Sequence, residues 1–284
     1  MAKLLLILAL LLGIPVVRSG QGGNEVTIAL DPAMPAGRKL SLPPVEGPLN
    51  RPLVVIDPGH GGRDPGALST QRTTREKDVT LAIARSIRDA LVASGRVRVA
   101  LTRNGDSYLP LRDRYEIARQ LKADLFISVH ADAAPDPAAT GATIYTLSEV
   151  ASDVEAASLA ARENKADIIH GVDLGAQNAG AERILIDLAQ RESMDISAGF
   201  ASLLYRESSP LVPFRPDHHR FAALVVLKAP DIPSILFEAG YLTHEPDLAF
   251  VASAEGQSRI AQGMRRAIEA HFARRIAGSP GRRI

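Results

Sequence analysis

The stretch that most constrains the fold is residues 54–62, which read Val-Val-Ile-Asp-Pro-Gly-His-Gly-Gly. The β-branched residues at its start are typical of a buried strand, and Asp57, Pro58 and Gly59 end that strand. His60 follows on a tight loop whose glycines let the backbone approach a ligand closely. In open α/β sheets, sites are built at the carboxyl ends of strands. A lone loop histidine is weak support for a site, so the rest of the chain decides its role.

Composition limits what such a site could contain. The chain has 284 residues, 46% of them hydrophobic and 23% charged, which suits one large or two small globular domains. The net charge of +1 gives no indication of a nucleic-acid partner. Because there is no cysteine, disulfides, thiolate metal sites and a lipoprotein anchor are excluded. Any metal must be held by histidines and carboxylates.

The N-terminus has the features of a secretory signal peptide. Lys3 gives a positive start, and residues 4–12 form a continuous apolar run. This run is too short for a typical membrane-spanning helix, although an uncleaved anchor is the alternative. We expect residues 1–20 to be the signal peptide, with no membrane span after cleavage. Residues 21–52 are rich in proline and predict a linker without a core of its own.

The rest of the chain alternates between strand and helix patterns. Strands are expected at 54–56, 97–102, 124–129, 142–147, 222–227 and 234–237. Helices are expected from Glu76 to Gly95, after a capping box of Thr73 and Glu76, and at 111–121, 152–169, 179–204 and 257–276. This order predicts an α/β fold, with a mostly parallel or mixed central sheet of about six strands and helices on both faces.

Polar residues capable of catalysis follow several of these elements. His60, His130 and Glu238 stand at the ends of three expected strands, and Glu76 stands near the start of a helix. Strand ends gather at one edge of a sheet, so these side chains can converge. Two histidines and one carboxylate form a catalytic zinc set with an open position for water. Zinc makes hydroxide available near neutral pH, and a second carboxylate can transfer the proton.

Each of these residues also has an alternative structural role. Glu76 can simply complete the capping box with Thr73. His130 can be a hydrogen-bonded core histidine, and Glu238 can pair with an arginine. The sequence favours a shared site because all four residues stand at element boundaries on the same expected edge.

Several short motifs together resemble one enzyme family. The matching stretches are residues 55–62, 75–79, 101–103, 123–132, 227–234 and 237–240. In combination they resemble a zinc-dependent N-acetylmuramoyl-L-alanine amidase of the type used in bacterial cell separation. The resemblance implies a catalytic domain over residues 53–276, followed by a short tail at 277–284.

The resemblance also implies roles for individual residues. His60, Glu76 and His130 would be zinc ligands, and Glu238 would be the general base. The bond cleaved would be the amide between the lactyl group of N-acetylmuramic acid and L-alanine of the peptidoglycan stem peptide. No position in the motifs is missing, so the resemblance implies an active enzyme.

Residues 148–172 resemble an inserted regulatory helix of the cell-division amidases. At helical spacing, Glu163 shares a face with Ala156, Leu159 and Ala160. A carboxylate inside an apolar stripe suggests a docked face with one charged contact. The resemblance implies that Glu163 binds the metal and inhibits the enzyme until a LytM-domain activator displaces the helix. With the signal peptide, it also implies a periplasmic location. The alternative is a surface helix whose Glu163 pairs with an arginine or lysine.

Two other classes of function remain open from the sequence. The first is another zinc hydrolase, such as a peptidase or a deacetylase, that uses the same metal set. The second is a non-catalytic peptidoglycan-binding module, which would tolerate the loss of His60, His130 or Glu238.

Overall fold

The computed structural model describes residues 40–134, 136, 139–169 and 182–277. Its centre is a six-stranded sheet in the order β2-β1-β3-β6-β4-β5. The strands are β1 (Leu53–Pro58), β2 (Arg98–Leu101), β3 (Leu125–His130), β4 (Ala142–Leu147), β5 (Phe214–Ala222) and β6 (Ser234–Glu238). Strands β2, β1, β3 and β6 are parallel, whereas β4 runs antiparallel to β6 and parallel to β5. The expected signal peptide, most of the expected linker and residues 170–172 of the regulatory segment lie outside the described residues, as does the tail after Ala277.

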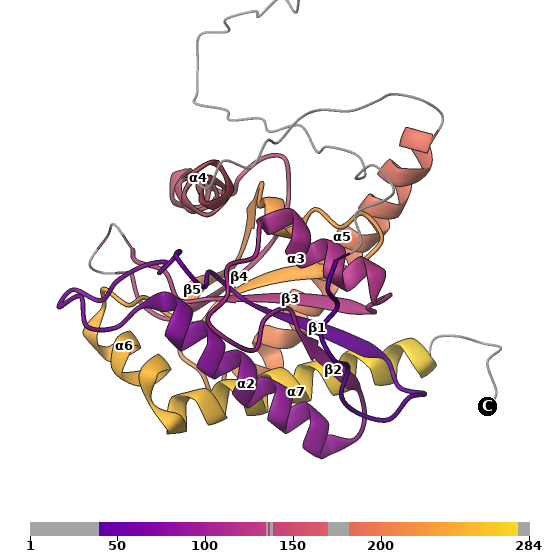
Figure 1. Cartoon of the computed structure of the whole chain (residues 1–284), viewed down its shortest axis with the longest axis horizontal. Coiled ribbons are helices and arrows are strands. Elements are labelled where there is room, and N and C mark those ends of the chain that lie inside the picture. Colours follow the sequence, from indigo (N-terminus) through magenta and orange to yellow (C-terminus); the bar gives the residue numbers. More distant parts are fainter. Residues whose placement is uncertain (1–39, 135, 137–138, 170–181, 278–284) are drawn as a thin grey trace, which may run out of the picture.

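Helices cover both faces of this sheet (Figure 1). They are α2 (Glu76–Ser94), α3 (Leu111–Gln120), α4 (Val154–Ile169), α5 (Glu182–Ser208), α6 (Glu245–Ala252), α7 (Ala254–Ala277) and the short 3₁₀ helix η1 (Val225–Leu227). One hydrophobic core joins the sheet to α2, α5, α6 and α7, and a second joins it to α3, α4 and η1. The prediction of a mixed α/β sheet with helices on both faces is therefore confirmed.

The apolar run of β1 follows from this double coverage. Val54 and Ile56 point into one core, whereas Leu53 and Val55 point into the other. Because both faces are buried, the strand reads as continuous apolar residues without polar alternation. The same packing places the polar residues that follow the strand at its carboxyl end, outside both cores.

The expected capping box of Thr73 and Glu76 is wrong. Helix α2 begins at Glu76, its N-cap is Arg75, and no side chain caps it. The backbone N–H of Thr73 instead donates to the hydroxyl of Ser69 at 3.2 Å. The carboxylate of Glu76 turns away from its own helix and accepts backbone hydrogen bonds from Ala67 and Ala131. Tertiary partners therefore override the local capping pattern.

The expected strand at 222–227 is also wrong in its position. The strand β5 ends at Ala222, and Val225–Leu227 forms a 3₁₀ helix whose apolar side chains pack into the second core. Strand β5 lies at the edge of the sheet and contains several arginines and histidines, so it lacks the apolar pattern of a central strand. Helix α6 was not expected from the sequence.

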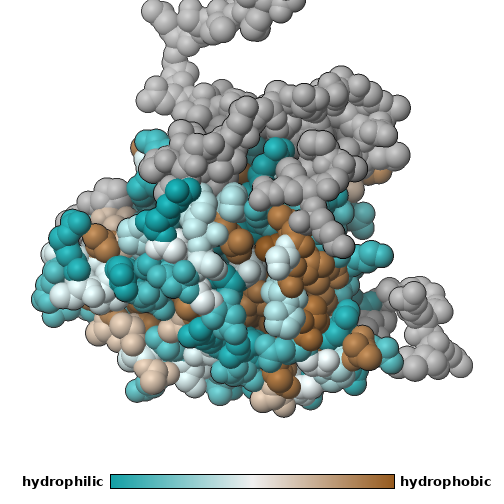
Figure 2. All heavy atoms as spheres, in the orientation of Figure 1, coloured by the Kyte–Doolittle hydropathy of each residue, from teal (hydrophilic) through white to brown (hydrophobic). Residues whose placement is uncertain are grey.

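The surface mixes hydrophilic and hydrophobic residues (Figure 2), and large apolar side chains such as Leu49 and Val154 are exposed. Among the described residues, no helix has both the length and the apolar character needed to cross a bilayer.

Candidate metal centre

Three parallel strands bring the expected site residues to one edge of the sheet. His60 follows the end of β1, whereas His130 and Glu238 are the last residues of β3 and β6. His130 lies directly opposite Glu238 in the pairing of these two strands. The prediction that the strand ends converge is confirmed in geometry.

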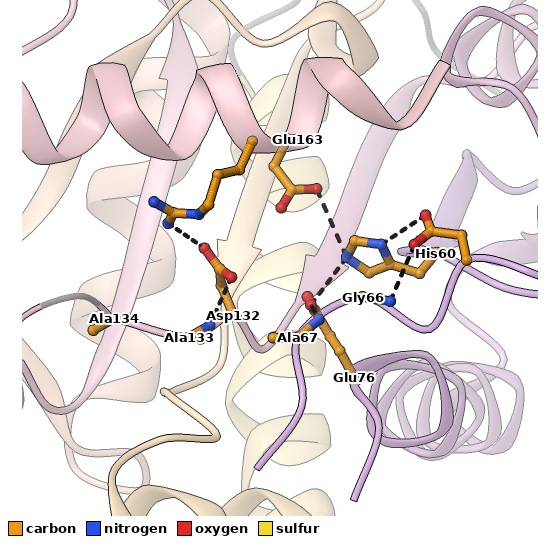
Figure 3. Close-up of a pocket in the computed structure, with 10 residues that line it drawn as sticks. His60, Gly66, Ala67, Glu76, Asp132, Ala133, Ala134 and Glu163 are labelled. Carbon is orange, nitrogen blue, oxygen red and sulfur yellow. Dashed lines mark hydrogen bonds and ion pairs between the residues drawn. The ribbon is translucent and has the colours of Figure 1, made fainter. Parts of the chain in front are cut away.

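Glu76 completes this cluster from the first turn of α2. Its Oε2 lies 3.0 Å from Nε2 of His60, and its Oε1 lies 3.1 Å from Nδ1 of His130. Glu163 enters from α4, and its Oε2 lies 3.7 Å from Nε2 of His60 and 3.3 Å from Nδ1 of His130. Figure 3 shows Glu163 descending from its helix toward the His60 ring, with Glu76 near the same ring. Two imidazole nitrogens and two carboxylates thus face one small volume.

This donor set fits a zinc ion. Bond lengths of about 2.0–2.2 Å place the ligands of a tetrahedral zinc site roughly 3.3–3.6 Å apart. The four distances between the histidine nitrogens and the carboxylate oxygens, 3.0–3.7 Å, bracket that range. Nε2 of His60 is buried and completes no hydrogen bond of good geometry in the described structure, although Oε2 of Glu76 lies 3.0 Å away. A buried nitrogen that faces carboxylates without completing a hydrogen bond is suited to bind a metal ion.

The neighbours of these ligands hold them in orientation. Nδ1 of His60 lies 2.9 Å from Oδ2 of Asp64. A hydrogen bond from Nδ1–H to this carboxylate leaves Nε2 free to coordinate a metal. The backbone N–H groups of Ala67 and Ala131 donate to the two oxygens of Glu76 at 2.8 and 2.9 Å. Protein contacts alone therefore hold the side chains of His60 and Glu76 in position.

The loop that carries His60 is packed too closely for larger residues. His60 itself has a positive φ of 60°, and Gly66 has a φ of 65°. A Cβ at Gly66 would lie 2.6 Å from both Oε2 of Glu76 and Cδ2 of His60. Glycine at this position therefore permits the contact between the side chains of Glu76 and His60.

Two buried arginines hold the backbone of the same loop. Arg114 donates to the carbonyl oxygens of Pro58 and His60, each at 2.9 Å, and forms an ion pair with Asp57 at 3.0 Å. Arg103 donates to the carbonyl oxygens of Pro58 and Gly59 at 3.0 and 2.8 Å. Charge-assisted bonds of this kind are stronger than neutral ones and fix the unusual backbone of His60.

The centre concentrates negative charge in a buried place. Glu76, Asp132, Glu163 and Glu238 are all buried there. Burial and the neighbouring carboxylates Asp132 and Glu76 raise the pKa of Glu238 well above its usual range, and burial also raises the pKa of Glu163. Although burial opposes it, the two histidines lower the pKa of Glu76 well below its usual value. A divalent cation would compensate this charge.

Glu238 stands beside the donor set with one oxygen available. Its Oε2 accepts a hydrogen bond from the backbone N–H of Asp132 at 3.2 Å. Its Oε1 is buried and has no hydrogen-bond partner in the described structure. A carboxylate held at one oxygen and unpaired at the other is suited to proton transfer.

Helix α4 covers this centre, and residues of both line a cavity of about 460 Å³. The stripe of Ala156, Leu159 and Ala160 is buried, as the helical spacing predicts, and Glu163 is only 6% exposed. Arg162, the preceding residue, forms an ion pair with Asp132 at the edge of the centre. At the centre itself, the helix therefore contributes two charged residues, Arg162 and Glu163, where one charged contact was expected.

Sequence reasoning missed Asp64, Asp132 and Arg162. Asp64 stands four residues after His60, a short-range carboxylate that a search around the histidine could have found. Asp132 follows His130 within one of the motifs quoted above, but its partner Arg162 is 30 residues away. No local pattern indicates that pairing.

Comparison with known proteins places this geometry in a family. The model of the N-acetylmuramoyl-L-alanine amidase family matches residues 54–270. The chain is 34% identical over 251 residues to the N-acetylmuramoyl-L-alanine amidase AmiA of Escherichia coli, covering 88% of this chain and 86% of that protein.

Solved structures agree with this relationship. The catalytic domain of CwlV, an N-acetylmuramoyl-L-alanine amidase from Bacillus (Paenibacillus) polymyxa, superposes with a TM-score of 0.58 at 25% identity, covering 78% of this chain and 98% of that one. The amidase AmiC2 of Nostoc punctiforme gives a TM-score of 0.55 at 26% identity, with coverage of 78% and 97%. The resemblance seen in the motifs is confirmed: this chain belongs to the N-acetylmuramoyl-L-alanine amidase family.

Proposed function

We propose that this chain is a zinc-dependent enzyme that hydrolyses the amide between the lactyl group of N-acetylmuramic acid and L-alanine of the stem peptide. Its role would be cell-wall remodelling and daughter-cell separation. The observation that carries this proposal is the convergence of His60, Glu76 and His130 beside Glu238, in a chain whose residues 54–270 match the amidase family.

The proposed roles follow from the contacts. His60, Glu76 and His130 hold the metal, oriented by Asp64 and by the backbone amides of Ala67 and Ala131. A bound zinc ion would supply Lewis acidity toward the scissile carbonyl and would make water more acidic. Glu238 takes the proton of the attacking water and delivers it to the leaving amine of L-alanine. Its raised pKa, caused first by burial, favours holding that proton between the two transfers.

We also propose that α4 inhibits the enzyme. Glu163 lies within 3.7 Å of both histidine nitrogens, and Arg162 pairs with Asp132, so the helix occupies the space a substrate carbonyl needs. Removal of the helix would require a partner that binds it more tightly than the centre does. A LytM-domain protein is the activator that the resemblance suggests.

The proposed location is the periplasm, reached through the signal peptide of residues 1–20. Its support is the positive start and apolar run of the sequence, together with the peptidoglycan substrate.

The products of digestion test the proposed reaction. Purified peptidoglycan is incubated with zinc-loaded protein, both wild type and Glu163→Gln, and the soluble products are identified by mass spectrometry. An amidase releases whole stem peptides that begin with L-alanine and leaves glycan strands without peptide. A peptidase would leave L-alanine attached to the glycan, and a deacetylase would release acetate; either result would overturn the proposal.

Glu238→Gln is the matched catalytic variant in this experiment. It should lose about 10²–10⁴-fold in rate, because the proton acceptor is removed. It should keep its zinc, because Glu238 is not among the proposed ligands. Loss of zinc together with activity would instead place Glu238 in the metal shell.

A further inference from the structure

Helix α4 touches the body of the protein at a second charged place, eight residues before Glu163. The carboxylate of Glu155 lies between two arginines of β5. Arg215 donates to both of its oxygens, at 2.7 and 3.1 Å, and Arg220 lies 3.1 Å from Oε2. The side chains of Arg215 and Arg220 are only 14% and 5% exposed. One carboxylate is thus enclosed by two guanidinium groups, which we call the arginine pair.

The arginine pair is joined to the catalytic edge of the sheet. Arg215 donates to the hydroxyl of Tyr241 at 2.9 Å, and Tyr241 follows Glu238 by three residues. Arg220 donates to the hydroxyl of Tyr145 on β4 at 3.4 Å. Strand β4 also pairs with Glu238 through Thr143. The arginine pair and the metal centre therefore lie on neighbouring strands of the sheet, and α4 contacts both of them.

Removal of α4 would take away most of the carboxylates that now pair with Arg215 and Arg220. Asp153, which precedes the helix and pairs with Arg220, and Glu155 would both be withdrawn with it. Asp217 of β5 remains near both arginines, at 3.3 and 3.5 Å. One carboxylate cannot balance two guanidinium groups, and an unbalanced, partly buried charge is unfavourable. An anion with two oxygens in a plane would suit the geometry, because guanidinium groups bind carboxylates in a bidentate manner.

We propose that Arg215 and Arg220 form a subsite for a carboxylate of the stem peptide, and that Glu155 occupies it while α4 covers the centre. The inference rests on the proposed function and names a part of its substrate. Glu155 and Glu163 are eight residues apart on one helix, which corresponds to about 12 Å along its axis. An extended peptide covers this distance in roughly three to four residues. The subsite therefore takes a side-chain or terminal carboxylate near the third or fourth residue of the stem.

Two soluble substrates and a set of variants in the full-length, zinc-loaded protein test this subsite. The substrates are an N-acetylmuramoyl tetrapeptide with free carboxylates on its third and fourth residues, and the same compound with these groups amidated. The double substitution Glu155→Ala and Glu163→Ala opens the helix, and Arg215→Gln or Arg220→Gln is then added. Arg206→Gln, an exposed arginine on α5, is the matched control.

The opened enzyme should prefer the acidic substrate by about 10- to 100-fold in kcat/KM, mainly through a lower KM, because charged hydrogen bonds are lost on amidation. Arg215→Gln and Arg220→Gln should remove this preference and leave the amidated substrate unaffected, whereas Arg215→Lys should retain part of it. Without the opening substitutions, Arg215→Gln should raise activity, because the contact with Glu155 is lost. Arg215→Gln should thus raise activity in the closed protein and lower activity toward the acidic substrate in the opened protein. A residue that only attaches the helix would show the first effect without the second.

Equal kcat/KM for the two substrates, or an equal loss on both in Arg215→Gln, would overturn the subsite while leaving the amidase function intact. If the opened protein hydrolyses neither substrate, the proposed function fails separately. In that case, calorimetry still measures whether the opened protein binds the acidic tetrapeptide. Binding that Arg215→Gln abolishes would support the subsite. No binding, or binding that Arg215→Gln leaves unchanged, would overturn it.

Discussion

The carboxylate of Glu163 lies 3.3 Å from Nδ1 of His130, although one residue belongs to a helix outside the sheet and the other ends a central strand. This contact joins α4 to the donor set and makes the helix part of the candidate metal centre.

Glu163→Gln should therefore raise the rate of dye release from labelled peptidoglycan, because a neutral amide is a poorer metal ligand. We expect an increase of about tenfold or more, corresponding to roughly 1.4 kcal/mol of lost helix docking. Glu149→Gln, an exposed glutamate before the helix, is the control. Equal rates for wild type and Glu163→Gln would contradict inhibition by α4.

Asp64 should control zinc affinity through His60. Its carboxylate lies 2.9 Å from Nδ1 of His60, the ring nitrogen that points away from the candidate metal position. Asp64→Asn should weaken zinc binding by about 10–100-fold, as the loss of such an outer contact usually does. Competition with a chromophoric chelator measures the affinity. Asp89→Asn on the exposed face of α2 should bind zinc like the wild type, and an unchanged affinity in Asp64→Asn would show that the ring needs no such support.

Gly66 should be essential for assembling the centre. Gly66→Ala would place a Cβ 2.6 Å from both Glu76 and His60, at a positive φ. We expect a destabilisation of about 1–3 kcal/mol from the crowding, together with the loss of bound zinc. Metal analysis and urea unfolding measure the two effects. Gly105→Ala, where no atom lies within 4 Å of the added Cβ, should change neither, and a Gly66→Ala protein with full zinc content would refute the close-approach argument.

His271 should make the stability of the fold depend on pH, away from the metal centre. Burial, reinforced by Arg275, lowers the pKa of His271 to about 4. The folded state therefore favours the neutral ring, and this stability is present above the unfolded pKa of about 6.5 and is lost as the pH falls toward 4.

The variant His271→Leu isolates this effect. Between pH 7.5 and pH 5, the wild type should lose roughly 2 kcal/mol of unfolding free energy relative to His271→Leu. Urea unfolding of both proteins at both pH values measures this difference in unfolding free energy. Any pH dependence that comes from the metal centre cancels in the comparison, because both proteins contain that centre. Gln262→Ala, at an exposed position of the same helix α7, should follow the wild type. A constant difference between wild type and His271→Leu would mean that His271 titrates normally in the folded state.

Five of the six strands, and the convergence of three candidate site residues, could be predicted from the sequence. β-branched runs followed by Asp-Pro-Gly-His-Gly-Gly and by Phe-Glu-Ala-Gly indicate buried strands that end in polar loops. Because parallel strands end at a common edge, His60, His130 and Glu238 had to lie near one another. The apolar stripe around Glu163 likewise predicted a docked helix, since helical period alone fixes which residues share a face.

The pairing of the other charged groups could not be predicted from the sequence and follows from the tertiary structure. Glu76 does not take part in a capping box, because the backbone N–H groups of Ala67 and Ala131 donate hydrogen bonds to its two carboxylate oxygens. Arg162 meets Asp132 across 30 residues, and Arg215 meets Glu155 across 60. Local periodicity encodes the face on which a side chain lies, but the partner of a charged group depends on which distant elements the folded core brings together.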